Sequence, residues 1–369
     1  MFKKQIALAM AVAMAFGVGG CTQKEETTTP TDFVEKKGEP ASFESGVELQ
    51  ENCIHLIYAL GNAPATIDAA KFFKMRLEQE TNGAMTVDIY TDNVLGGERE
   101  LLEGCQFGDY DIVLATNATV ASFCNDIYCL DIPWLFDNKQ QVYEVLDGKL
   151  GDYLGDQLNE VGFELLQWQE NSFRTLSTTN QPIESMDDLQ GLKIRIMENE
   201  LQLAQWKAYG ANPTPMAFTE LFTALQQGTV DGQDNGAELT WQSKFCEVQK
   251  YYIYTKHIYS PYVILMSKER FEELTPEQQE IILQISDEAV AYERERCSEY
   301  EAVALENIKN YPGMNFSELN EETKAQMKEA CAGIKDLAYT KVTHPEVIDL
   351  LYSEVELAKQ KYPEPSGQE

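Results

Sequence analysis

Gly191-Leu192-Lys193-Ile194-Arg195-Ile196 lies at the centre of the stretch that decides the fold, Gln169 to Ser243. Leu192, Ile194 and Ile196 alternate with two cations, which predicts a half-buried strand with its aliphatic side chains on one face and Arg195 on the other. A guanidinium offers a planar fork of donors that fits a carboxylate in bidentate fashion. Arg174 stands upstream in another β-like run. The whole stretch is typical of a strand–helix–turn–helix–strand unit.

The residues before this stretch alternate between strand and helix patterns. We expect strands over 54–60, 85–90 and 112–115, with helices between them that end near residues 81–83 and at Gly108. This rhythm predicts a parallel sheet with helices on both faces, in which ligands bind at the carboxyl ends of the strands. Gly61-Asn62-Ala63 and Thr116-Asn117 should then lie near a cleft.

Further helices and strands follow from local signals. Thr275-Pro276-Glu277-Gln278 is a capping box with proline at the first helical position, and it should open a helix to about residue 308 that lies across two domains. Thr219 can cap a helix that Gly228 ends. The remaining expected elements are helices over 142–158, from Asn320 and over 345–361, and strands over 163–168 and 263–267.

The chain is strongly acidic. Its 369 residues include 29 basic and 61 acidic side chains, for a net charge of −32. This balance argues against nucleic acid or an anionic membrane surface as a partner. An anion-binding site would have to be locally positive against that field.

The N-terminus is typical of an exported, lipid-anchored protein. Residues 1–20 combine a basic start with an apolar run, which predicts a signal peptide. Val18-Gly19-Gly20-Cys21 resembles a lipobox, so Cys21 is the predicted lipidation site and the mature chain would lie outside the cytoplasmic membrane or in the periplasm. An ordinary signal peptide with an incidental cysteine is the alternative. Residues 21–46 are polar and predict a disordered tether.

Motifs for catalysis and for metals are missing from the sequence. Only three histidines occur, no common hydrolase or nucleotide-binding motif is present, and the seven cysteines after Cys21 are dispersed without metal-ligand spacing. Those cysteines could form disulfides in an oxidising compartment or stay reduced. We therefore expect no enzyme activity, no metal and no cofactor.

Three motifs in order carry a family resemblance: residues 187–195, residues 213–226 and residues 228–235. Together they resemble the solute-binding subunits of tripartite ATP-independent periplasmic (TRAP) transporters, the DctP-like family. The resemblance implies an α/β fold of two lobes, similar to type II periplasmic binding proteins, with a ligand cleft between them and a long helix spanning both. It also implies delivery of a small organic acid to a membrane permease.

The resemblance also implies the binding residues. Arg195 would clamp the ligand carboxylate, Arg174 would support the site from the hinge, Asn235 would donate its amide and Phe218 would pack on the ligand. Each has a structural alternative: a surface arginine, a hinge ion pair, a turn asparagine and a core aromatic, respectively. Topology alone adds Thr116 and Asn117.

Two departures from the family pattern bear on the ligand. Met197 and Gly236 stand where proline is frequent, and Glu198 follows Met197. A carboxylate at Glu198 would repel a second acidic group on the ligand if it faces the cleft, or would lie in solvent otherwise. We therefore favour a monocarboxylate with polar substituents, such as a sugar acid or hydroxy acid, over a simple C4-dicarboxylate.

The expected domain organisation follows from these elements. Lobe one should comprise residues 47–170 and 262–300, lobe two residues 171–261 and 301–355, and residues 356–369 a C-terminal tail. Because the chain crosses between lobes more than once, closure should be a rigid-body hinge motion. The alternatives to a transport subunit are a secreted lipoprotein glycosidase and a ligand-sensing module.

Overall fold

The computed structural model describes residues 43–364 of the chain. The predicted signal peptide, Cys21 and most of the predicted tether lie outside these residues. The last tether residues are described, and the ring of Phe43 packs edge-on against Tyr292 with centroids 6.1 Å apart. This end of the predicted tether therefore contacts the folded part of the chain.

The first sheet has five strands in the order β2-β1-β3-β10-β4. β1 (Ile54–Ala59) is parallel to β2 (Met85–Tyr90) and to β3 (Ile112–Thr116). β10 (Tyr262–Ser267) pairs antiparallel with β3 and with β4 (Phe163–Gln169). The parallel arrangement predicted for β1, β2 and β3 is confirmed, and β10 adds antiparallel pairs because it follows directly from a strand of the second sheet without a crossover helix.

The second sheet has six strands in the order β11-β9-β5-β8-β6-β7. β6 (Lys193–Ile196) runs parallel to β7 (Asn212–Pro215) and to β8 (Gly232–Asn235). β5 (Phe173–Thr178) is antiparallel to β8 and to β9 (Tyr251–Tyr259), and β11 (Asn315–Glu318) is parallel to β9. The prediction for β6 is confirmed, since Ile194 and Ile196 are fully buried in the core.

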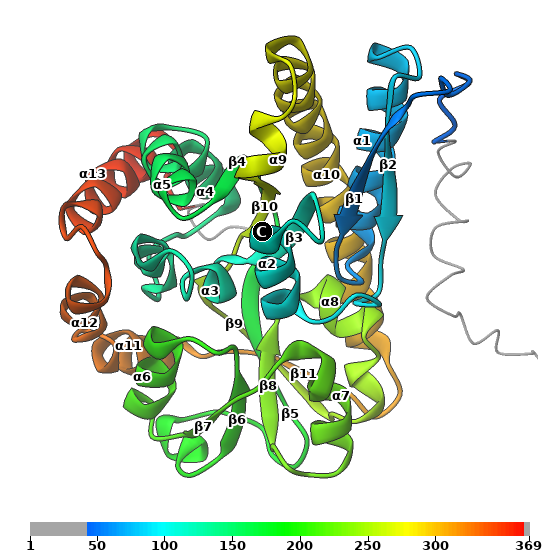
Figure 1. The fold of residues 1–369 in the computed structure, drawn as a ribbon. Coiled ribbons are helices and arrows are strands. Elements are labelled where there is room, and N and C mark those ends of the chain that lie inside the picture. Colours follow the sequence, from blue (N-terminus) through cyan, green and yellow to red (C-terminus); the bar gives the residue numbers. More distant parts are fainter. Residues whose placement is uncertain (1–42, 365–369) are drawn as a thin grey trace, which may run out of the picture. The chain divides into compact units, whose positions relative to one another are not determined.

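Helices surround the two sheets (Figure 1). Their bounds are α1 Pro64–Glu80, α2 Glu98–Phe107, α3 Asn117–Val120, α4 Lys139–Leu146, α5 Lys149–Glu160, α6 Glu200–Ala208, α7 Phe218–Gln226, α8 Ala237–Gln242, α9 Lys268–Glu272, α10 Pro276–Asn310, α11 Glu321–Ala330, α12 Ile334–Lys341 and α13 Glu346–Lys361. Short 3-10 helices cover Asn125–Asp131, Met186–Leu189 and Phe245–Glu247.

Several helix predictions are confirmed by their caps. Thr275 accepts from the backbone of Gln278, whose side chain returns the bond, so α10 begins with the predicted capping box and runs for 35 residues. Gly108 adopts the left-handed conformation that ends α2. Asn320 caps α11 through the backbone of Thr323.

Other helix predictions were wrong. The single helix expected over 142–158 is two helices, because Gly148 is extended and starts α5 anew. Helix α7 begins at Phe218 after Ala217, so Thr219 lies inside its first turn and does not cap it. The sequence pattern missed α12 altogether.

Three segments cross between the two sheets: the β4–β5 connection, the β9–β10 connection and α10. Helix α10 packs against α1 and β4 of the first sheet and against α8 and β11 of the second (Figure 1). This arrangement confirms the predicted α/β class with a long helix reaching both sheets. Burial of apolar side chains such as Leu56, Leu77 and Ile285, at about 1.5–3 kcal/mol each, stabilises these layers.

The division into lobes stays a prediction. The strands of the first sheet all fall within 47–170 and 262–300, and those of the second within 171–261 and 301–355. Helix α13, however, packs on α4 and α5 beside the first sheet and continues to Lys361, through the boundary predicted for the tail.

Among the described residues, no helix combines the length and the apolar character that crossing a membrane requires.

Candidate functional site

A pocket of about 320 Å³ opens where strands of both sheets end. The first sheet contributes the β1–α1 turn, including Asn62 and Ala63, and Thr116 at the end of β3. The second contributes Arg195 of β6 and Asn235 of β8. Carboxyl ends of strands are the usual location of ligand sites in α/β sheets. The pocket therefore lies where the sequence analysis placed the cleft.

Arg195 is a buried cation without a carboxylate partner among the described residues. Its side chain is 2% exposed, and its Nε and Nη2 donate to the Met216 carbonyl at 3.0 and 2.9 Å. Burial and the neighbouring Arg174 lower the pKa of Arg195 to about 10, and nearby carboxylates only partly offset this. An anion in the pocket would supply the missing counter-charge, because an opposite charge favours the ionised form of a buried group.

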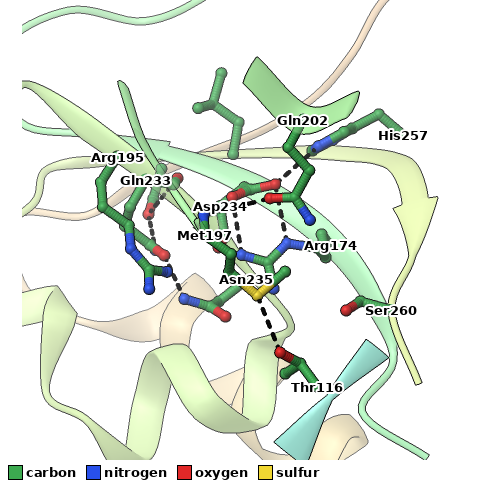
Figure 2. Close-up of polar contacts among 12 residues, drawn as sticks. Thr116, Arg174, Arg195, Met197, Gln202, Gln233, Asp234, Asn235, His257 and Ser260 are labelled. Atoms are coloured by element: carbon green, nitrogen blue, oxygen red, sulfur yellow. Dashed lines mark hydrogen bonds and ion pairs between the residues drawn. The ribbon is translucent and has the colours of Figure 1, made fainter. Parts of the chain in front are cut away.

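Arg174 is held in place by a buried ion pair. Its Nε and Nη2 donate to Oδ2 and Oδ1 of Asp234 at 3.0 and 2.9 Å, and Nη2 also donates to the Asp234 carbonyl (Figure 2). The pocket touches both Arg174 and Asn235. The two sequence alternatives for Arg174, site residue and ion pair, are therefore compatible.

Asp234 is positioned in turn by His257. The fully buried imidazole lies 3.0 Å from Asp234 Oδ2 through Nε2, and its Nδ1 lies 2.8 Å from the Thr255 hydroxyl. Burial raises the pKa of Asp234, but the charge of Arg174 and the bonds from His257 and Arg174 outweigh it and hold the pKa below its ordinary range. Sequence reasoning assigned a role to neither residue: Asp234 lies within the motif of residues 228–235 but pairs with groups distant in sequence, and His257 belongs to no motif.

Asn235 and Phe218 also reach the pocket. Asn235 Nδ2 donates to Oε1 of Gln233 at 2.6 Å, which fixes the orientation of the amide beside Arg195 (Figure 2). Phe218 is the first residue of α7, and the centroid of its ring lies 5.9 Å from Arg195 Cζ, which is a cation–π distance. Phe218 therefore covers the guanidinium and also lines the pocket.

Thr116 and Glu198 line the pocket, whereas Asn117 does not. Glu198 is exposed and stands at the rim. Asn117 is fully buried, and its Oδ1 accepts from the Ser260 hydroxyl at 2.9 Å. Its expected place in the site is therefore corrected: α3 begins at Asn117 and turns the side chain into the interior, away from the pocket.

Glu98 is a pocket residue that sequence reasoning overlooked. Its Oε2 accepts from the hydroxyls of Thr116 and Thr119 at 2.6 and 2.5 Å. It stands in the first turn of α2 after Gly96-Gly97, where the helix dipole favours a carboxylate. This combination of two glycines and an acid at a helix start was the available signal. The pocket thus has two buried arginines on the second sheet and the half-buried Glu98 beside the first, while the exposed Arg99, Glu100, Glu198 and Glu220 also line it.

The described residues contain no group of three or more acidic, histidine or cysteine side chains that could hold a metal ion. The seven cysteines after Cys21 are free thiols. The arrangement at the pocket is suited to binding an anion that also carries groups able to donate hydrogen bonds.

Comparison with known proteins gives the class. The sequence profile described as bacterial extracellular solute-binding protein, family 7 (DctP), matches residues 59–341. The 2,3-diketo-L-gulonate-binding periplasmic protein YiaO of Escherichia coli is 33% identical over 241 residues, which cover 65% of this chain and 74% of YiaO.

Solved structures agree with the fold. The sugar acid binding protein DctPAm of Advenella mimigardefordensis in complex with galactonate has a TM-score of 0.80 and 31% identity, covering 84% of this chain and 100% of that one. A TRAP solute-binding protein of Sulfurospirillum deleyianum with bound succinate has a TM-score of 0.76 and 29% identity, covering 83% and 100%.

The fold and pocket define an extracytoplasmic solute-binding protein with two lobes. The chain belongs to the DctP family, the solute-binding proteins of TRAP transporters. The predicted resemblance and the expectation of binding instead of catalysis are confirmed, since this family serves transport.

In the ligand-free protein, loss of the carboxylate that pairs with Arg174 should lower the stability of the fold, whereas loss of the Arg195 charge should change it little. Asp234→Asn leaves Arg174 buried and unpaired, so we expect the free energy of unfolding to fall by roughly 3 kcal/mol. Arg195→Met removes a buried charge that has no carboxylate partner, so we expect a change of less than about 1 kcal/mol. Urea unfolding of both variants measures this. A loss at Arg195→Met as large as at Asp234→Asn would contradict the assignment of Arg195 as a ligand-binding group.

Proposed function

We propose that this protein is the solute-binding lipoprotein of a TRAP transporter and captures a small organic acid by its carboxylate. The observation that carries the proposal is the buried Arg195 guanidinium, which faces the pocket without a carboxylate partner in the described part of the chain. Arg174 and Asn235 stand beside it. A carboxylate at this place would satisfy the remaining donors and balance the charge.

The magnitude of this interaction is sufficient for capture. A charge-assisted hydrogen bond contributes about 1.5–3 kcal/mol net, so a two-bond fork supplies roughly half of the 8 kcal/mol of a micromolar affinity. The remainder would come from Asn235, from packing on Phe218 and from groups of the first sheet. Because these groups sit on both sheets, a ligand that touches all of them would favour a closed arrangement over an open one.

The acidic groups of the pocket favour a hydroxylated monocarboxylate. Glu98 can accept hydrogen bonds from ligand hydroxyls, and Glu198 at the rim adds further negative charge. A second carboxylate on the ligand would meet repulsion there. Two relatives bind such acids, galactonate and 2,3-diketo-L-gulonate, whereas the Sulfurospirillum protein holds succinate. Sugar acids and hydroxy acids are therefore the proposed ligand class.

Ligand capture is tested by thermal shift against a panel of aldonates, hydroxy acids and C4-dicarboxylates. We expect at least one hydroxylated monocarboxylate to stabilise the protein, by about 2.7 kcal/mol at a hundredfold excess over the dissociation constant. Arg195→Met should abolish the stabilisation, because the fork that holds the carboxylate is lost.

Lys193→Ala is the matched control. Lys193 lies on the same strand as Arg195 but is exposed and does not line the pocket, so its removal should leave the stabilisation unchanged. Full stabilisation of Arg195→Met by the same acid would exclude Arg195 as the clamp.

Glu98 should set the preference between ligand classes. Glu98→Gln keeps an acceptor but removes the charge, so binding of a hydroxylated acid should weaken about tenfold, the equivalent of roughly 1.4 kcal/mol. Binding of succinate should strengthen, because repulsion is relieved. Isothermal titration calorimetry measures both, with Glu103→Gln of the same helix, outside the pocket lining, as control. Equal changes in the two variants would contradict this role for Glu98.

The proposed lipid anchor is at Cys21, and the proposed partner of the closed complex is the membrane permease. Cys21→Ser should prevent lipidation while leaving export intact, so the protein should move from the membrane fraction to the soluble extracytoplasmic fraction. Fractionation with detection of the protein in both pools measures this. A variant that remains in the membrane fraction would argue against lipid attachment at Cys21.

A further inference from the structure

Three carboxyl side chains are buried together where the chain crosses between its two sheets. Glu170 lies on the β4–β5 connection, Glu238 on α8 and Glu293 on α10. Glu170 and Glu293 are at most 1% exposed and Glu238 is 9% exposed. Ionised carboxylates at such positions are costly unless each has a cation or several donors. Their partners therefore decide which of them carry charge.

The nearby cations serve only part of this group. Lys139 of α4 contacts Glu170 and also Glu301, with a distance of 2.6 Å to Glu301, which lies about two turns beyond Glu293 on α10. Burial lowers the pKa of Lys139, but the carboxylates of Glu301 and Glu170 more than offset this and raise it. Arg294 pairs with Asp147 outside the group. Arg294 forms no ion pair with Glu293 or Glu238, and its charge lowers the pKa of Glu293 by less than burial and the neighbouring carboxylates raise it.

Glu293 is the more isolated of these two. Its Oε2 accepts from the backbone N–H of Glu170 at 3.1 Å, and its Oε1 has no hydrogen-bond partner in the described structure. The hydroxyl of Tyr58 on β1 is likewise buried without a partner. Burial, followed by the charges of Glu170 and Glu238, raises the pKa of Glu293 well above its ordinary value.

Glu238 connects the two sides of the pocket. Its Oε1 accepts from the backbone N–H of Ala65 at the start of α1, at 3.0 Å, and its Oε2 lies 3.4 Å from the Cys297 thiol of α10. The adjacent Leu239 and Thr66 line the pocket. Burial raises the pKa of Glu238 to about 7, with Glu301 and Glu170 adding to the effect.

The other titratable groups that face the carboxyls supply no further positive charge. They are the Tyr143 phenol of α4, which donates to Glu170, the Tyr259 phenol of β9, the Tyr262 phenol of β10 and the Cys297 thiol. Burial raises the pKa of each of them, so all are neutral near pH 7. When Glu238 or Glu293 ionises, its charge must therefore be solvated, either by water that enters the interior or by separation of the packed elements.

We propose that Glu238 and Glu293 couple protonation to the packing of the joint between the two sheets, by which we mean α8, α10 and the start of α1. The joint is closed when both carboxyls are protonated, and it is loosened by entering water when they ionise. The elements that would separate are these three, of which α8 and α1 contribute Leu239 and Thr66 to the pocket lining. Acidification would then favour the arrangement in which the pocket walls are held together, whether or not a ligand is present.

The sign of the linkage follows from the direction of these shifts. A carboxyl with a raised pKa in the folded protein stabilises it fully below the ordinary pKa of glutamate, and this stability is lost as pH rises through the folded pKa. For Glu238 the loss begins near the ordinary pKa of glutamate and is complete above about pH 7. Glutamine stands in for the protonated acid, so Glu238→Gln/Glu293→Gln should retain the stability at high pH.

The test uses the ligand-free full chain, so it is independent of the proposed ligand. Between about pH 5.5 and about pH 8.5 the melting temperature of the wild type should fall by roughly 5 °C more than that of Glu238→Gln/Glu293→Gln. Glu280→Gln/Glu295→Gln is the matched control, because it removes two exposed carboxylates from the same long helix and should keep the wild-type slope. Identical slopes for wild type and Glu238→Gln/Glu293→Gln would overturn the proposal.

Two measurements on the wild type complete the test if the glutamine variants fail to fold. Small-angle X-ray scattering should show a larger radius of gyration at the higher pH, and an unchanged radius would exclude the loosening. Infrared spectra at neutral pH should contain the C=O stretch of a buried protonated carboxyl that disappears on alkalinisation. Absence of that band at neutral pH would equally overturn the proposal.

Discussion

The proposed binding site depends on one buried guanidinium, that of Arg195. Ile194 and Ile196 anchor β6 in the core, and the alternation of the strand then directs Arg195 to the opposite face. There Arg195 meets a carbonyl and an aromatic ring but no carboxylate among the described residues. A buried cation without a counter-charge is stabilised by an anion, and the pocket provides the space for one.

Placing two arginines side by side requires that one of them be neutralised. Asp234 does this for Arg174, and His257 holds Asp234 in turn, so the pair contributes rigidity and little net charge. Arg195 keeps its charge available. The opposite wall carries Glu98, held by two threonine hydroxyls. Among the less exposed groups of the pocket, Arg195 therefore faces it from the second sheet and Glu98 from the first, a pattern that suits a ligand with an acid group at one end and hydroxyls at the other.

The acidity of the chain is distributed in two physically different ways. Most acidic residues in the described part of the chain are at least partly exposed, where they cost little. A few are buried where the chain crosses between sheets, and there we propose that the same side chains respond to protons, because they are buried and, among the described residues, Lys139 is the cation that pairs with Glu170. The joint and the pocket share α8 and the start of α1, so the two sites are mechanically connected.

The sequence by itself determined the features that depend on neighbours along the chain. Strand alternation placed Arg195, the capping box at Thr275 started α10, and the ordered motifs of residues 187–235 indicated the family. Only the tertiary structure decided the features that need residues far apart: the antiparallel entry of β10, the inward turn of Asn117, and the meeting of Glu98, Asp234 and His257 with residues distant in sequence. Local patterns fix periodicity and caps, whereas strand direction and side-chain partners are set by packing between segments that the sequence does not bring together.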